Sequence, residues 1–556
     1  MKMSNQPAKT KKAMKTMKFL SVAALALVGA AMTGCTSDDN IIGQPQQPEV
    51  VKGNTVTLTT TVSLGDGAST RALTGTGVKT FAAGETMALV YKNTGGSTVK
   101  VVSTALTDGD ITAEGKSATF TFELTDPDKT ENVTYIYPAA MAKADGTVNY
   151  DALNSQDGTL TTLSSNLDLA TSAATAWNEG SLPAVTLDNQ LAVLAITLKN
   201  EDGSSDITSS TTKLTVSDGT NTYNVTREAA AGPIYVAIRP TSDATIDIAA
   251  TSGGKGYYKT LTTAKSYTAS NGYSVSWKMK QGANLSLLTA AYTAQNGDIL
   301  TGTMGSNVKI SIADGATVTL KDLNINGSGT WTSGDYSGIT CAGNATITLE
   351  GTNTVKGFAN KYPGIFVSSG KTLVINGTGE LNASSNGSSN TGSGGAGIGG
   401  GERMDCGNIE IQSGTVTATG NQYGAGIGGG QNANCGDITI SGGIVTATGG
   451  YRAAGIGGGR RGVSGTSGKY DSGSCGNITI SGGTITATGG DAAAGIGGGR
   501  GNNNNYKSSC GTITITSGVT NVTATKGSSD ANSIGAGVAG ICGTVTIADG
   551  ANVTQN

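Results

Sequence analysis

The side chains that could perform chemistry are limited first by the complete absence of histidine. Serine–histidine and cysteine–histidine nucleophiles and histidine metal sites are excluded, so proton transfer would fall to carboxylates, lysine, tyrosine or cysteine. Polysaccharide hydrolases use paired carboxylates, and lyases use calcium-binding carboxylates with a lysine or arginine base. The acids of the second half are scattered, although Glu402 and Asp405 share one segment. We expect no enzyme, cofactor or metal, with a lyase or hydrolase acting on an acidic glycan as the alternative.

Tyrosines and arginines in glycine-rich segments form a second group, which is suited to binding sugars. Aromatic rings stack on sugar faces, and guanidinium groups pair bidentately with carboxylates. Tyr423 and Arg452 are 29 residues apart, at the same position of a repeat, so we expect them to be neighbours. The candidate carbohydrate-binding residues are Tyr423, Tyr451, Arg452, Arg460, Arg461, Tyr470, Arg500 and Tyr506. An acidic sugar is the expected ligand, and scattered solvated loop residues are the alternative interpretation.

Cysteine follows the same repeat. Segments of the form Cys-Gly-x-Ile-x-Ile begin at Cys406, Cys435, Cys475 and Cys510, with a variant at Cys542. Zinc sites need clustered pairs such as Cys-x-x-Cys, which are absent. An exported protein can form disulfides, but stacked in-register positions do not easily meet the disulfide dihedral. We therefore expect these cysteines to fill coil corners as small apolar residues and to be mostly unbridged.

The repeat that carries these residues predicts a parallel β-helix. Gly-Ile-Gly-Gly-Gly recurs at Gly397, Gly426, Gly455 and Gly495. In Ile-x-Ile pairs such as Ile438 and Ile440, both side chains face the same way because strand side chains alternate. Fixed segments at variable spacing are typical of a solenoid with loops on one face. The glycines are expected at tight corners between coils, because no βαβ unit surrounds them to form a dinucleotide site.

Composition divides the chain near residue 280. Residues 1–280 contain 23 glycines and residues 281–556 contain 63. The first part has short alternating runs of Thr, Val and Ala between turn residues, which is typical of antiparallel sandwich strands. The expected fold is all-β: a β-sandwich region over 51–280, whose length suits one large or two small sandwiches, followed by a parallel β-helix solenoid over 281–556.

The N-terminal segment has the pattern of an export signal. Six lysines precede an apolar run from Phe19 to Met32, which is too short to span a membrane. Thr33-Gly34-Cys35 resembles a bacterial lipobox, and Asp38-Asp39 resembles the acidic export signal of Bacteroidota surface lipoproteins. This resemblance implies a signal peptide over 1–34, a lipid on Cys35 and a tether over 35–50. An ordinary cleaved signal is the alternative.

The first part contains a series of characteristic segments: Thr80–Glu85, Met87–Tyr91, Tyr135–Pro138, Tyr235–Pro240 and Lys265–Val275. In this order they resemble the fimbrillin family, the type V pilus and pilus-tip lipoproteins of Bacteroidota. The family fold is two transthyretin-like sandwiches, and many members are cut after an arginine beyond the first strand. The matching position here is Arg71-Ala72. Cleavage there would free an edge that accepts a strand from another pilus subunit.

The second part resembles the β-helical carbohydrate-binding modules of bacterial surface proteins, through Tyr292–Asp298, Ile347–Gly351 and the glycine and cysteine repeats. The combined expectation is a surface-exposed outer-membrane lipoprotein adhesin, in some cases within a fimbrium, that binds glycans or a host surface. A spacer or pilus component without a ligand is a further alternative. Nucleic acid is not an expected partner, because the net charge is −3 before the lysine-rich signal is removed.

Overall fold

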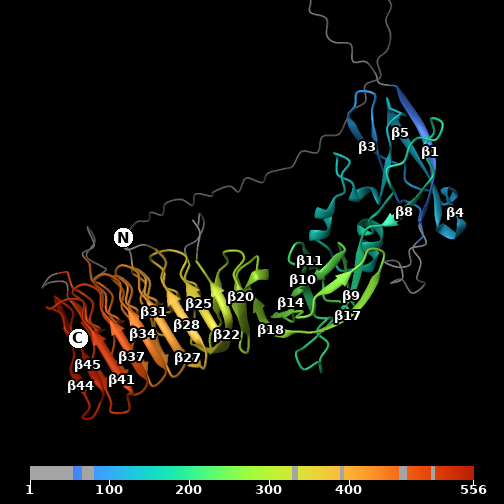
Figure 1. Cartoon of the computed structure of the whole chain (residues 1–556). Helices are drawn as coiled ribbons and strands as arrows, with labels where there is room; N and C mark the ends of the chain where they lie inside the picture. Colours follow the sequence, from blue (N-terminus) through green and yellow to red (C-terminus); the bar gives the residue numbers. More distant parts are fainter. Residues whose placement is uncertain (1–53, 65–79, 328–335, 388–393, 463–472, 503–506) are drawn as a thin grey trace, which may run out of the picture. The chain divides into compact units, whose positions relative to one another are not determined.

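The computed structural model describes residues 54–64, 80–327, 336–387, 394–462, 473–502 and 507–556 (Figure 1). The expected signal peptide, lipid-attachment residue Cys35 and tether lie outside the described residues, as do Arg71-Ala72, Tyr470 and Tyr506. No helix of the described ranges is long and apolar enough to cross a membrane. The all-β class, with sandwich strands followed by a parallel β-helix, is confirmed. The domain boundary at residue 280 stays a prediction.

The first hydrophobic core is enclosed by an eight-stranded sheet with the order β3-β2-β6-β7-β8-β1-β5-β4. Alternation positions its side chains: in β5, Phe120 and Phe122 are buried while Thr119 and Thr121 are partly exposed. Phe81 meets Phe120 edge to face at 5.4 Å between ring centroids. The strands are β1 Thr55–Leu64, β2 Ala88–Lys92, β3 Thr98–Val102, β4 Ile111–Thr112, β5 Ser117–Thr125, β6 Thr134–Tyr137, β7 Ala170–Thr171 and β8 Val185–Asn189.

Single helical turns interrupt these strands and connect them to the next set. They are η2 Asp108–Asp110, η3 Ala113–Gly115, η4 Ala139–Met141, η5 Tyr150–Asn154, α1 Leu160–Thr162 and η6 Leu163–Leu167, with η7 Leu285–Leu287 further on. The buried Gln156 side chain, which follows η5, exchanges two hydrogen bonds with the backbone of Ala237. That pair ties the helical turns to the second core.

The second core lies between the three-stranded sheet β12-β9-β17 and the strands β11, β10, β14 and β15. Its central strand β9 reads AVLAITLK and is buried along most of its length, as expected for a strand that is covered on both faces. The strands are β9 Ala192–Lys199, β10 Thr211–Ser217, β11 Thr222–Thr226, β12 Ile234–Ile238, β13 Thr241–Ala244, β14 Asp247–Ser252, β15 Lys255–Thr260, β16 Lys265–Tyr267, β17 Gly272–Lys278 and β18 Lys280–Asn284.

Backbone pairing continues from this sandwich into the β-helix. Strand β18 pairs antiparallel with β15 and parallel with β20 (Ile299–Thr303), a strand of the β-helix. The fully buried Asp298 carboxylate accepts hydrogen bonds from the Tyr292 hydroxyl at 2.6 Å, the Gln281 amide at 2.8 Å and the Gln295 backbone N–H at 2.9 Å. Three donors satisfy a charge that would otherwise be costly to bury.

The β-helix is built from three ladders of parallel strands, seen stacked from yellow to red in Figure 1. The first ladder contains β20, β22 Ala316–Ile325, β24 Ala345–Glu350, β27 Thr372–Gly377, β30 Asn408–Ile411, β33 Ile438–Ile440, β36 Ile478–Ile480, β40 Ile513–Ile515 and β44 Val545–Ile547. The second contains the end of β22, β25 Thr352–Lys356, β28 Glu380–Ser384, β31 Thr415–Thr419, β34 Ile444–Thr448, β37 Thr484–Thr488, β41 Asn521–Thr525 and β45 Val553–Gln555.

The third ladder has nine short strands: β19 Tyr292–Ala294, β21 Ile310–Ile312, β23 Ile339–Cys341, β26 Ile365–Val367, β29 Ile398–Gly399, β32 Ile427–Gly428, β35 Ile456–Gly457, β38 Ile496–Gly497 and β42 Ile534–Gly535. Two further strands, β39 Ser508–Cys510 and β43 Gly540–Cys542, pair with each other. Equivalent residues stack in register, so Ile438 lies between Ile409 and Ile478, all with no exposed surface. The predicted inward isoleucine ladder is confirmed.

Glycine is required where the third ladder turns. Gly399, Gly428, Gly457 and Gly497 all have φ between +128° and +132°. A Cβ atom on Gly428 would lie 2.1 Å from the carbonyl oxygen of Gly457 in the next coil, and the other positions are equally tight. Only glycine combines this backbone conformation with such close approach. The predicted structural role of the Gly-Ile-Gly-Gly-Gly segments as tight corners is confirmed.

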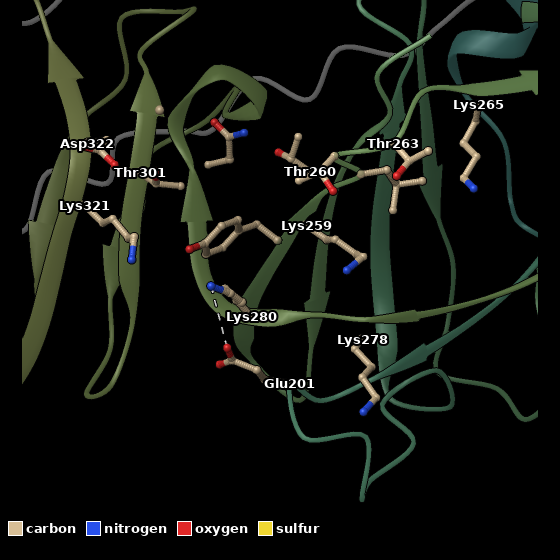
Figure 2. Close-up of a pocket in the computed structure, with 15 residues that line it drawn as sticks. Glu201, Lys259, Thr260, Thr263, Lys265, Lys278, Lys280, Thr301, Lys321 and Asp322 are labelled. Atoms are coloured by element: carbon tan, nitrogen blue, oxygen red, sulfur yellow. Dashed lines mark ion pairs between the residues drawn. The ribbon is translucent and has the colours of Figure 1, made fainter. Parts of the chain in front are cut away.

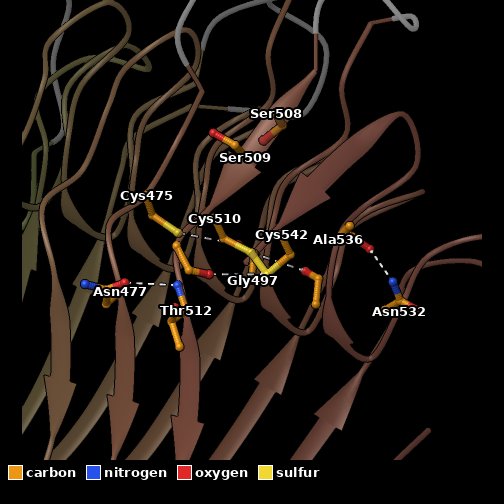
Figure 3. The surroundings of a disulfide bond; sticks show 12 residues. Cys475, Asn477, Gly497, Ser508, Ser509, Cys510, Thr512, Asn532, Ala536 and Cys542 are labelled. Atoms are coloured by element: carbon orange, nitrogen blue, oxygen red, sulfur yellow. Dashed lines mark hydrogen bonds between the residues drawn. A yellow bond between two sulfur atoms is a disulfide. The ribbon is translucent and has the colours of Figure 1, made fainter. Parts of the chain in front are cut away.

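The cysteines follow the expected stacking with one exception. Cys341, Cys406, Cys435 and Cys475 are buried free thiols, whereas Cys510 and Cys542 form a disulfide (Figure 3). In-register pairing of β39 with β43 brings their Cα atoms to 4.6 Å, within the range that disulfides span. The expectation that stacking disfavours a bridge was therefore wrong for this pair. Reduction is expected to cost about 3–4 kcal/mol, because the bond closes a loop over a sequence separation of 32 residues.

Burial controls the chemistry of the free thiols. It raises the pKa of Cys341 to about 12 and also raises the pKa of Cys475. A hydrogen bond with Cys406, together with burial, raises the pKa of Cys435. Cys341, Cys435 and Cys475 therefore remain neutral near pH 7, as expected for apolar corner residues that are poor nucleophiles.

Candidate functional site

Six predicted binding residues gather along one edge of the β-helix, and we call them the arginine–tyrosine cluster: Tyr423, Tyr451, Arg452, Arg460, Arg461 and Arg500. Tyr423 and Arg452 follow the second-ladder strands β31 and β34, whereas the other arginines follow Gly-Ile-Gly-Gly-Gly segments. Backbone hydrogen bonds join these two kinds of segment. The N–H of Arg460 donates to the carbonyl oxygen of Tyr423 at 2.9 Å, and that of Arg500 donates to Arg452 at 3.0 Å.

The side chains of the cluster stack in pairs. The Arg460 guanidinium carbon lies 4.3 Å from the ring centroid of Tyr423, and that of Arg452 lies 4.8 Å from the ring of Tyr451. The two tyrosine rings are 6.4 Å apart and tilted by 41°. Cation–π contacts of this kind hold planar groups in fixed orientations. The cluster therefore presents guanidinium groups and a ring as an ordered surface.

The cluster is positively charged. Among the described residues, the ion pair formed by its four arginines is that of Arg500 with Asp491 at 3.7 Å. Burial, aided by the neighbouring charges of Arg452 and Arg500, lowers the pKa of the Arg460 guanidinium, which still remains charged at neutral pH. Partly buried cations attract an anion more strongly than fully solvated ones, because water screens them less.

The Tyr451 side chain is the accessible part of the cluster. It is 45% exposed, which is unusual among the large apolar side chains of the described residues. Arg452 is oriented by the donation of its Nη2 to the Tyr451 hydroxyl at 3.3 Å. Arg461 is held in place by its own donation to the carbonyl oxygen of Lys507 at 2.6 Å. The arrangement can bind an anion and cover a sugar face.

The repeat predicted Tyr423 and Arg452 on adjacent coils, and the strands that precede them, β31 and β34, pair in register at the same 29-residue spacing. Sequence analysis did not anticipate that the Tyr423 ring packs against Arg460 and Tyr451. Asp491 was not anticipated either. One sequence feature could have predicted the contact between Arg460 and Tyr423. Arg460 directly follows a Gly-Ile-Gly-Gly-Gly corner, and this corner turns the chain back toward the end of the preceding second-ladder strand.

The scattered acids of the β-helix have structural roles. Asp314, Asp405 and Asp437 each accept the backbone N–H of a residue one coil further on, all at 2.7 Å. Such contacts satisfy backbone donors at the coil edge. Asp405, one of the two acids considered for catalysis, is therefore engaged with Asn434. Across the described ranges, no group of three or more Cys, Asp or Glu could hold a metal ion.

Comparison with known proteins supports the repeat. Residues 409–431, 438–460 and 478–500 match the family model described as Beta helix repeat. The matched segments contain most of the arginine–tyrosine cluster. No curated protein matches the sequence.

Part of the chain is similar to solved structures of Bacteroidota fimbrial proteins. A fimbrial assembly protein from Parabacteroides distasonis is 12% identical, with 40% of this chain and 91% of that chain covered and a TM-score of 0.24. A fimbrial protein from Bacteroides ovatus is 15% identical, with 41% and 49% covered and a TM-score of 0.21. The tip fimbrial protein from Porphyromonas gingivalis is 10% identical, with 37% and 81% covered and a TM-score of 0.18.

Proposed function

We propose that this protein is a surface adhesion lipoprotein whose β-helix binds acidic glycans through the arginine–tyrosine cluster. The observation that carries the proposal is the gathering of the Arg452 and Arg460 guanidinium groups on the tilted rings of Tyr423 and Tyr451, with the charge of Arg500 near enough to act on Arg460. Guanidinium groups would pair bidentately with sugar carboxylates, and Tyr451 would cover an apolar sugar face. The β-helix ladders supply a rigid support for these groups, which preorganises the surface.

Attachment to the outer membrane is part of the same proposal. It is supported by the lipobox-like sequence at Cys35 and the acidic residues after it. Cys35→Ala should abolish incorporation of a labelled fatty acid and release the protein from the membrane fraction. Full membrane retention of the variant would contradict a lipid anchor at this residue.

Assembly into a fimbrium is a second candidate function, favoured by the position of β1. This strand precedes Arg71 in sequence and lies between β5 and β8 in the eight-stranded sheet, with Val62 fully buried. Removal of β1 after cleavage at Arg71 would open a slot between two strands, which a donor strand from another subunit could fill. Arg71→Ala should block both processing and polymer formation, while monomeric glycan binding is retained.

The binding proposal is tested by calorimetric titration of the full chain with galacturonate and neutral galactose oligosaccharides. Arg460→Ala/Arg461→Ala should weaken galacturonate binding about tenfold, since charge-assisted hydrogen bonds are lost. Arg460→Lys/Arg461→Lys is the matched control, because it keeps the charge but removes bidentate geometry. An intermediate loss in this variant supports specific carboxylate recognition. Preference for neutral sugars, or unchanged binding by the alanine variant, would contradict the proposed site.

A further inference from the structure

A second basic feature lies where the sandwich strands meet the first coils of the β-helix. A cleft of about 870 Å³ is lined by strands β15, β16, β17 and β18 on one side and by β20 and β22 on the other. Its volume falls within the usual range for ligand-binding clefts. Five lysines from five different strands surround it, as Figure 2 shows: Lys259, Lys265, Lys278, Lys280 and Lys321.

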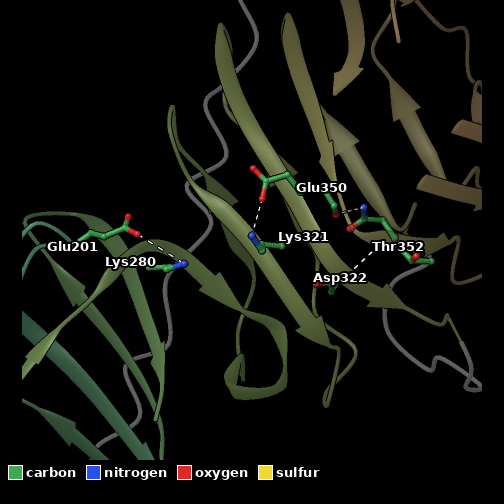
Figure 4. Close-up of polar contacts among 7 residues, drawn as sticks. Glu201, Lys280, Lys321, Asp322, Glu350 and Thr352 are labelled. Carbon is green, nitrogen blue, oxygen red and sulfur yellow. Dashed lines mark hydrogen bonds and ion pairs between the residues drawn. The ribbon is translucent and has the colours of Figure 1, made fainter. Parts of the chain in front are cut away.

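The positive charge of this lysine cleft is only partly balanced. Figure 4 shows the two ion pairs: Lys280 with Glu201 at 3.8 Å and Lys321 with Glu350 at 2.8 Å. The other acid at the cleft, Asp322, accepts the backbone N–H of Thr352 at 3.1 Å. Glu201 and Asp322 are therefore the acids that line a cleft holding five lysines.

Two of the five lysines, Lys259 and Lys265, are free to meet a ligand. A third, Lys278, donates to the backbone carbonyl of Asp202 at 3.0 Å, which fixes its ammonium group without neutralising it. Within the described part of the chain, Lys259 and Lys265 make neither an ion pair nor a side-chain hydrogen bond. Like charges held around one cleft repel each other, and a bound anion removes that repulsion.

The lining also has the mixed character of a sugar site. Leu261 and the ring of Tyr258, both largely buried, supply apolar surface, while Thr260, Thr263 and Thr301 line it with hydroxyl-bearing side chains. None of the described residues that line the cleft is an arginine, so this lining lacks the planar fork that orients a carboxylate. Lysine ammonium groups act as point charges with three donors each, so such a cleft selects for charge density.

We propose that the lysine cleft binds a sulfated sugar chain. A sulfate ester spreads its charge over three oxygens and can accept from ammonium groups in several directions, and sulfated sugars can carry more than one charge per ring. Carboxylated chains carry fewer charges and gain less from point-charge partners. This site is separate from the arginine–tyrosine cluster and does not depend on the activity proposed there.

The experiment is calorimetric titration of the full chain with a heparin-derived hexasaccharide. Lys259→Gln/Lys265→Gln removes the two lysines without ion-pair partners, so folding should be unaffected while affinity falls about tenfold. The salt dependence of binding should also weaken in this variant. The matched control is Lys92→Gln/Lys116→Gln, which removes two exposed lysines of the first sandwich and the same net charge. Its affinity should equal that of the parent protein.

Two further arms distinguish the outcomes. A desulfated heparin hexasaccharide, which retains its carboxylates, should bind the parent chain more weakly, and binding equal to that of the sulfated probe would overturn the proposal. Unchanged heparin affinity in Lys259→Gln/Lys265→Gln would overturn it as well. Loss of heparin binding in Arg460→Ala/Arg461→Ala but not in the lysine variant would assign the probe to the arginine–tyrosine cluster instead. Lys265→Glu serves as a second variant at an exposed position and should weaken binding further.

Discussion

Replacement of one corner glycine tests how closely the coils pack. Gly428 lies in β32 with φ of +128°, and an added Cβ would approach the Gly457 carbonyl oxygen to 2.1 Å. Gly428→Ala carries two costs. The backbone conformation is unfavourable for alanine by about 1–2 kcal/mol, and the carbonyl oxygen must move by roughly 1 Å to relieve the overlap.

That movement is resisted by the ladder itself. The Gly457 carbonyl oxygen accepts the N–H of Gly429 at 2.9 Å, so displacing it sacrifices a hydrogen bond worth about 1 kcal/mol. Overpacking of a rigid interior adds about 1–3 kcal/mol. The sum is about 3–6 kcal/mol. Since 1.4 kcal/mol corresponds to a tenfold change, exchange of amides in this corner should accelerate by roughly a hundredfold or more.

The matched control is Gly315→Ala. Gly315 also has a positive φ, +75°, but nothing lies within 4 Å of its added Cβ. Its substitution therefore carries the backbone cost alone, about 1–2 kcal/mol. Hydrogen-exchange mass spectrometry of the peptides around each substitution measures both effects. Equal acceleration in the two variants would refute the argument that coil contact, in addition to backbone conformation, requires glycine.

Three further predictions concern the interior. Ile440→Asp places a charge in the stacked core and should lower the free energy of unfolding by several kcal/mol. Thr439→Asp, on the partly exposed face, should change it by less than about 1 kcal/mol. Urea denaturation of the two variants measures both effects. The pKa of Cys341 is raised from 9.0 to about 12 in the folded state, so the free energy of unfolding should not depend on this thiol below pH 9. The free energy of unfolding should fall as the pH rises from 9 toward 12, because the thiol ionises more readily in the unfolded chain. Cys341→Ala should lack this pH dependence. Tyr292→Phe removes one of the three donors to the buried Asp298 and should cost about 2 kcal/mol in the same urea assay.

The periodic parts of this molecule were predictable from sequence because each coil repeats the same physical problem. The Ile438 position is apolar in neighbouring coils, and the Gly428 position is glycine in the successive coils from Gly399 to Gly535, so both leave a repeated signal. The individual contacts were less predictable. The disulfide between Cys510 and Cys542 occupies the same register as free thiols in other coils, and repetition alone does not mark which pair is bridged.

The binding surfaces show the same contrast. Tyr423 and Arg460 come from different segments of the repeat, and only the return of the chain at the glycine corner brings them together. The lysine cleft has no periodic signal at all. Lys259 and Lys321 are far apart in the sequence. They line the same cleft because β18 pairs with both β15, which contains Lys259, and β20, which pairs with the strand that contains Lys321. Long-range strand pairing of this kind leaves no local pattern for sequence analysis to detect.

The central claim, that the arginine–tyrosine cluster is the acidic-glycan site, is tested most directly by a hydrogen-exchange footprint. The full chain is compared with and without a saturating galacturonate hexasaccharide. The account predicts slower exchange in peptides that contain residues 420–425, 449–462 and 498–502, where the cluster residues are bonded to one another through their backbones. Protection confined to other segments, or binding without protection at these three, would contradict it.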